Sequence, residues 1–141
     1  MNDAKKQRLV EVAREFVGTT EEGGNNKGPL VEEFQRAVDG KAQNEAWCLA
    51  FVQYCVTGVS EENGIPNPLF KTEHCMTLWD KTPTKQRFKE PALGRIVLWQ
   101  KHRNGAPTLQ GHAGIVTEVL KDGYFRSVEG NTSDGSGINR D

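Results

Sequence analysis

Apolar positions in the first part of the chain recur at helical spacing. Between residues 3 and 17 the apolar side chains follow one another at steps of three and four, with charged residues between them. This pattern predicts an amphipathic helix that ends at Gly18. Pro29 suits the first turn of a second helix that runs to about Val38. The polar, glycine-rich stretch 19–28 between the two helices predicts a loop.

The most apolar segment of the chain is 47–56, in which nine of ten residues are apolar. A helix that is apolar on every side lies inside the core, so this segment predicts a buried helix. Asn44 can cap its start, and Gly58 is expected to end it. Residues 72–79 predict a short fourth helix after a turn-rich connection.

The pattern changes to that of strands from Arg95 onward. Apolar, β-branched runs occupy 95–100, 112–120 and 124–129, and Asp122-Gly123 predicts a turn that joins the last two runs as a hairpin. Helices that precede strands indicate an α+β fold, with N-terminal helices packed on a C-terminal antiparallel sheet.

The length of 141 residues suits a single domain spanning residues 1–141, and the natural chain is expected to continue beyond Asp141 because the sequence stops where another strand could begin. A net charge of −1 argues against a nucleic-acid partner. No run approaches the roughly 20 apolar residues of a membrane span, and no signal peptide is visible. The odd number of cysteines, three, without CxxC spacing argues against a disulfide framework.

Cys48 is the first candidate for chemistry. It stands near the start of the predicted buried helix, where unpaired backbone N–H groups and the helix dipole stabilise an anion. A thiolate there is a nucleophile if a histidine can exchange protons with it. The same N–H groups can hold the oxyanion of a tetrahedral intermediate.

His112 begins the second predicted strand, and Glu129 and Asn131 come at the far end of the third. Because the hairpin folds back on itself, either Glu129 or Asn131 can meet the imidazole of His112. A cysteine, a histidine and an orienting polar group form a catalytic triad. We favour Glu129 as the orienting residue, since a carboxylate also stabilises the imidazolium.

Three segments resemble the CHAP domains, the cysteine- and histidine-dependent amidohydrolases/peptidases of the NlpC/P60, papain-like group. They are Glu45-Ala46-Trp47-Cys48, Gly111-His112-Ala113-Gly114 and Val128-Glu129-Gly130-Asn131. The resemblance extends from about Gly23 to the end and includes phage-endolysin-like members. It implies a papain-like fold, Cys48 as nucleophile, His112 as general base and acid, Glu129 as its orienting residue, Asn131 as a further polar member of the site, and cleavage of peptidoglycan.

The resemblance also implies substrate contacts and shows one departure. The loop with Asn25 and Asn26 is expected to border the substrate groove, and Trp47 either lines the cleft or packs in the core. CHAP domains usually carry Gly-Asp before the first strand, whereas this chain has Gly94-Arg95. There is no calcium loop of the Asp-x-Asp-x-Asp-Gly type, so we predict no metal and no cofactor.

Simpler interpretations compete with several of these assignments. A free cysteine is most often a packing residue, which is how we interpret Cys55. His74-Cys75 offers zinc ligands, but without paired spacing. His102 is expected in a solvated loop, and the basic stretch 81–103 is either a solvated face or a surface for an anionic polymer. Trp79 and Trp99 are expected in the core.

These expectations lead to a peptidoglycan hydrolase, either an N-acetylmuramoyl-L-alanine amidase or an endopeptidase of the peptide stem or cross-bridge. One alternative is a cytoplasmic cysteine amidase for a small soluble peptide conjugate. Another is a catalytically silent wall-binding module. We expect a monomer that is made in the cytoplasm, does not insert into membranes, and reaches the wall after holin-type release or delivery by a tail or secretion machine.

Overall fold

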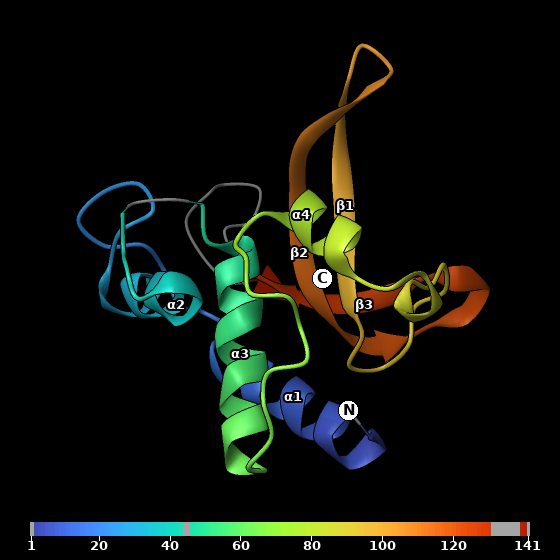
Figure 1. Ribbon diagram of the computed structural model, residues 1–141, viewed down its shortest axis with the longest axis horizontal. Helices are drawn as coiled ribbons and strands as arrows, with labels where there is room; N and C mark the ends of the chain where they lie inside the picture. Colours follow the sequence, from blue (N-terminus) through green and yellow to red (C-terminus); the bar gives the residue numbers. More distant parts are fainter. Residues whose placement is uncertain (1, 44–45, 131–138, 141) are drawn as a thin grey trace.

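The computed structural model describes residues 2–43, 46–130 and 139–140. Helices precede strands within this part of the chain, and the α+β class expected from the sequence is confirmed (Figure 1). The helices are α1 (Asp3–Glu15), α2 (Pro29–Asp39), α3 (Cys48–Glu62) and α4 (Cys75–Lys81), followed by a short 3-10 helix η1 (Thr84–Gln86).

The strands form one antiparallel sheet in the order β1-β2-β3-β4. Their bounds are β1 (Ile96–Arg103), β2 (Ala106–Val119), β3 (Phe125–Glu129) and β4 (Asn139–Arg140). A second 3-10 helix, η2 (Lys121–Gly123), joins β2 to β3. The β1–β2 hairpin projects beyond the rest of the molecule (Figure 1).

Helix α3 stands between α2 and the sheet, whereas α4 packs directly on β1 and β2 (Figure 1). Buried residues lie on every side of it, as its uniformly apolar sequence predicts. Phe51 on α3 meets Phe34 of α2 and Phe16 after α1, with ring centroids 5.3 and 6.2 Å away in edge-to-face arrangements. These aromatic contacts join three segments far apart in sequence into one core.

Most expected element boundaries hold within a few residues, and the exceptions concern α3, the stretch around His102 and the start of β2. Gly58 does not end α3, which continues to Glu62, because burial of the helix outweighs the intrinsic cost of a glycine, about 1 kcal/mol. The expected cap Asn44 lies outside the described residues, and α3 begins at Cys48 with Trp47 in the cap position. The stretch around His102 is strand instead of loop, because β1 is extended by its pairing with β2.

The early start of β2 has a local cause. Asn104 and Gly105 both adopt positive φ, at 52° and 79°, which is the conformation of a tight hairpin turn. The turn pairs Arg103 with Ala106 and thereby starts β2 six residues before His112. His112 therefore lies in the middle of a strand, and the expectation that it begins one is wrong.

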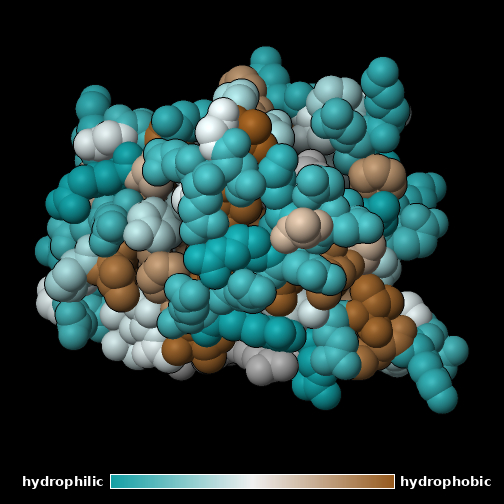
Figure 2. All heavy atoms as spheres, turned by 90° about the horizontal axis from the view of Figure 1, so that it is seen from below, coloured by the Kyte–Doolittle hydropathy of each residue, from teal (hydrophilic) through white to brown (hydrophobic). Residues whose placement is uncertain are grey.

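Among the described residues, no helix combines the length and the hydropathy needed to cross a bilayer. The face seen from below is largely hydrophilic, with hydrophobic side chains in separate groups (Figure 2).

Candidate active site

Cys48 is the first residue of α3, directly after the flanking residue Trp47. Its side chain is buried, and the backbone N–H of Ala113 on β2 approaches it. The pKa of the thiol is lowered to about 5, first by a hydrogen bond from Cys75 and further by His112, against the opposing effect of burial. The site therefore holds Cys48 as a thiolate at neutral pH.

His112 presents its ring to two partners. Its Nε2 lies 2.9 Å from Oε1 of Glu129, and the Cys48 thiol is the other neighbour that acts on the ring electrostatically. These two neighbours, Cys48 first, raise the pKa of His112 to about 9. At neutral pH the pair is thus a thiolate beside an imidazolium.

Glu129 ends β3 and is almost fully buried. Its Oε2 accepts a hydrogen bond from the hydroxyl of Ser127, two residues earlier on the same face of the strand. Between the two sequence candidates for the partner of His112, the structure places Glu129 in contact. Asn131 lies outside the described residues.

The sheet register brings His112 and Glu129 together. Ile115 pairs with Val128, so Gly114 lies opposite Glu129 and His112 lies two residues farther along the same face. A Cβ on Gly114 would stand 2.6 Å from Cγ of Glu129. The absence of a side chain at Gly114 therefore makes the room in which Glu129 reaches the imidazole.

Trp99 forms one wall of the site, contrary to the expectation that it lies in the core. It pairs with His112 across β1 and β2, and the two rings stack with centroids 5.7 Å apart at 28°. Trp99 also stacks near Phe125, with ring centroids 6.2 Å apart, and remains 38% exposed. Directly opposed residues of antiparallel strands share a face, so the contact follows from a register that the sequence alone did not reveal.

Trp47 is fully buried, so of its two expected roles the structure supports packing in the core and not contact with substrate. Its ring stacks on Phe34, and its Nε1 donates to Oε2 of Glu21 at 2.8 Å. A Cβ on Gly130, directly after Glu129, would lie 2.8 Å from the indole. Trp47 thus packs beneath the end of β3 and supports the site without lining it.

The loop with Asn25 and Asn26 is attached to this tryptophan through Glu21. The backbone N–H of Asn26 donates to the same Glu21 oxygen, and its carbonyl accepts from Gln35. Asn25 is exposed at the tip of the loop. Glu21 was not among the residues expected at the site, because a single carboxylate in a polar loop carries no distinguishing pattern.

The other cysteines have different environments. Cys55 is buried two turns deeper, and burial raises its thiol pKa, as befits a packing residue. Cys75, the first residue of α4, places its Sγ 4.0 Å from that of Cys48, a proximity the sequence did not indicate. In the described part of the chain, no group of three or more His, Cys, Asp or Glu side chains could hold a metal ion.

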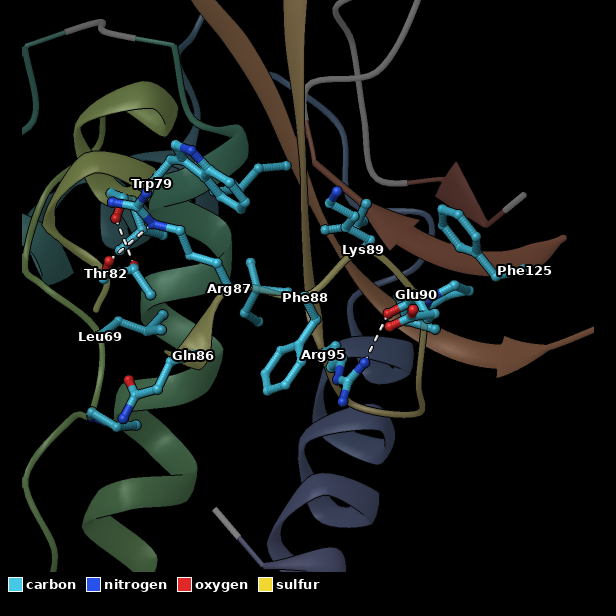
Figure 3. A pocket seen from close by; sticks show the side chains of 17 residues that line it. Leu69, Trp79, Thr82, Gln86, Arg87, Phe88, Lys89, Glu90, Arg95 and Phe125 are labelled. Atoms are coloured by element: carbon cyan, nitrogen blue, oxygen red, sulfur yellow. Dashed lines mark hydrogen bonds between the residues drawn. The ribbon is translucent and has the colours of Figure 1, made fainter. Parts of the chain in front are cut away.

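A pocket of about 370 Å³ lies beside the site, between α4, η1 and the sheet (Figure 3). Its lining does not include Cys48, His112 or Glu129. Trp79 lies at the edge of this pocket and is partly exposed, so the expectation that it lies in the core is wrong. The guanidinium of Arg87 covers its ring at 5.1 Å. Arg95 covers Phe88 at 3.8 Å. Part of the basic stretch 81–103 therefore packs on aromatic rings.

The arrangement provides the parts of covalent amide hydrolysis. It combines a thiolate at a helix start, an imidazolium that can protonate a leaving amine, and a buried carboxylate that holds the imidazolium in place. The unpaired N–H groups of the first turn of α3 can stabilise an oxyanion.

Comparison with known proteins agrees with this geometry. No curated protein and no solved structure matches the chain significantly. CHAP domains are typically cysteine- and histidine-dependent amidohydrolases or peptidases. The family model described as CHAP domain matches residues 40–131, more than half of the 141-residue chain, and the protein therefore belongs to the CHAP domain family.

Proposed function

We propose that the protein hydrolyses an amide bond of bacterial peptidoglycan, with Cys48 as nucleophile, His112 as acid and base, and Glu129 as the residue that orients the imidazole. The observation that carries this proposal is the continuous contact from the Cys48 thiol through the His112 ring to the Glu129 carboxylate at 2.9 Å. Membership of the CHAP family supports peptidoglycan as the substrate class.

The reaction follows from the protonation states at the site. The Cys48 thiolate attacks the amide carbonyl carbon, and the N–H groups at the start of α3 stabilise the resulting oxyanion. His112 gives its proton to the leaving amine as the C–N bond breaks. The neutral imidazole then activates a water molecule that hydrolyses the thioester, releases the carboxylate product and restores the ion pair.

Two features support a large anionic substrate. The His112 side chain is 23% exposed beside the exposed ring of Trp99, so a substrate can reach the imidazole. Exposed cations of the 81–103 stretch lie on β1, the strand that carries Trp99, and on η1 and the residues after it; among them are Lys85, Lys89, Lys101 and Arg103. We propose that this surface attracts the wall polymer, and that Asn25 and Asn26 border the groove as the family resemblance implies.

Digestion of purified peptidoglycan tests the proposal. Wild type, Cys48→Ala and the matched control Cys55→Ala would be incubated with the polymer, and released fragments weighed by mass spectrometry after labelling of new amino termini. We expect wild type and Cys55→Ala to release fragments and Cys48→Ala to release none, because Cys48 lies beside His112 and Cys55 does not. A new terminal L-alanine identifies an amidase, and any other terminus identifies an endopeptidase.

Two results would contradict the proposal. Equal digestion by wild type and Cys48→Ala would show that Cys48 is not the nucleophile. Failure of a folded wild-type protein to digest walls of several chemical types would exclude the wall polymer as substrate. Small soluble peptide conjugates would then be the next amides to assay.

A further inference from the structure

Cys75 lies in direct contact with the candidate nucleophile although 27 residues separate the two in sequence. Their sulfur atoms are 4.0 Å apart, both side chains are buried, and both thiols are free. Each cysteine is the first residue of its helix, α3 or α4. Two helix starts thus converge on one point of the sheet.

The packing around Cys75 is tight on the side of His112. A Cβ on Gly111, directly before His112 on β2, would stand 2.9 Å from Cβ of Cys75 and 2.6 Å from the carbonyl oxygen of Trp99. The glycine allows α4 to approach the strand at the position next to the catalytic histidine. Cys75 is therefore held between the strand that carries His112 and the helix start that carries Cys48.

The direction of the hydrogen bond follows from the charges. Cys48 faces the imidazolium of His112 and is the thiol that ionises, so its sulfur can only accept. The contact with Cys48, followed by burial, raises the thiol pKa of Cys75, because a second negative charge beside the first is unfavourable. Cys75 keeps its proton and is the donor.

We propose that Cys75 is a positioning residue of this site, whose S–H group donates a hydrogen bond to the Cys48 thiolate and holds that sulfur in place beside His112. The inference rests on the proposed function for its catalytic meaning, but the contact between the two thiols does not depend on which amide is cleaved. Cys75 does not touch the reacting amide; it acts through Cys48.

The test measures the reactivity of Cys48 without any substrate. Wild type, Cys75→Ala, Cys75→Ser and the control Cys55→Ala would be treated with iodoacetamide between pH 4 and 9, and alkylation at Cys48 followed by peptide mass mapping. Removal of the donor in Cys75→Ala is expected to move the alkylation profile of Cys48 to higher pH. On the acidic side of the profile, a midpoint that lies one pH unit higher makes alkylation about tenfold slower, because only the thiolate reacts.

Two variants separate this role from simple packing. A serine hydroxyl is also a donor, so Cys75→Ser should keep the profile closer to that of wild type than Cys75→Ala does. Cys55→Ala removes a buried thiol elsewhere on α3 and should leave the profile unchanged. Circular dichroism would confirm that each variant is folded. If Cys75→Ala is not, Cys75→Val would replace it as the variant without a donor, and Cys75→Thr would replace an unfolded Cys75→Ser.

An unchanged alkylation profile in folded Cys75→Ala would overturn the proposal, as would an equal displacement of the profile in Cys75→Ser and Cys75→Ala. The proposal would be supported if Cys75→Ala moves the alkylation profile to higher pH and Cys75→Ser leaves it close to that of wild type. Alkylation requires no peptidoglycan, so the two proposals can fail separately. If the wild-type protein does not digest walls but Cys75→Ala still shifts the alkylation profile, the wall-hydrolase proposal is refuted and the role of Cys75 stands.

Discussion

Individual side chains at the site are defined by their electrostatic neighbours. The Cys48 thiol is buried, which by itself would raise its pKa, yet the donors around it lower the pKa to about 5. Cys55 on the same helix has no such donors, and its thiol pKa is raised. Two turns along one helix thus separate a thiol whose pKa is lowered from one whose pKa is raised.

Catalytic activity should depend on pH through this ion pair. As pH rises through about 5 the thiolate forms, and as it rises through about 9 the imidazolium loses its proton. We expect a bell-shaped profile of kcat/KM with a plateau between these limits, whose edges belong to the coupled pair. Initial rates on peptidoglycan fragments across pH 4–10 would check this. An acid limb near pH 8 to 9 would show that Cys48 is an ordinary thiol.

Replacement of Glu129 should alter the alkaline limb. In Glu129→Gln the imidazolium loses its carboxylate, so the pKa of His112 falls and the alkaline limb moves to lower pH. We expect kcat to drop on the order of 100-fold, the scale of a disturbed general acid–base step. The pH profile of the variant is the measurement. Ser127→Ala serves as a milder comparison, because it removes only the hydroxyl bonded to the same carboxylate.

At the scale of the elements, the β2–β3 hairpin places the histidine and the carboxylate on one face of the sheet. The strand alternation and the Asp122-Gly123 turn were visible in the sequence, and the expected hairpin is confirmed, although a 3-10 turn joins its strands. The pairing of β1 with β2 was not expected, and this pairing brings Trp99 into contact with His112. Local patterns predict neighbouring strands, but the register decides which side chains meet.

A methyl group at Gly114 should disable the site while the fold survives. In Gly114→Ala the new Cβ would lie 2.6 Å from Cγ of Glu129 and displace the carboxylate from His112. We expect a loss of kcat of at least tenfold, measured with folded protein by fragment release. Gly58→Ala is the matched control: a Cβ there meets open space on α3, so it should keep activity and raise stability by about 0.5–1 kcal/mol.

At the scale of the whole molecule, the site depends on segments from both ends of the chain. The 19–28 loop reaches Trp47 through Glu21, and Trp47 packs against Gly130 at the end of β3. The N-terminal loop, the start of α3 and the end of β3 therefore meet around one indole. The carboxylate of Glu21 satisfies a buried N–H group that would otherwise be left without an acceptor.

Loss of this carboxylate should destabilise the protein. Glu21→Ala removes the acceptor of the Trp47 indole and of the Asn26 N–H, which should lower the free energy of unfolding by about 1–3 kcal/mol. Chemical denaturation followed by tryptophan fluorescence would measure it. The exposed neighbour Glu22 provides the control, since Glu22→Ala should change stability by less than about 0.5 kcal/mol. Equal effects of the two substitutions would contradict a structural role for Glu21.

The order of elements, the buried helix, the place of Cys48 near its start and the meeting of His112 with Glu129 could be inferred from the chain. They depend on interactions between residues close in sequence: helical periodicity, the start of one helix, and a hairpin whose two strands are adjacent. The contacts of Cys75, Trp99 and Glu21, and the burial of Trp47, depended on folding. Each joins segments that are distant along the chain, and neither spacing nor composition specifies which side chains such packing brings together.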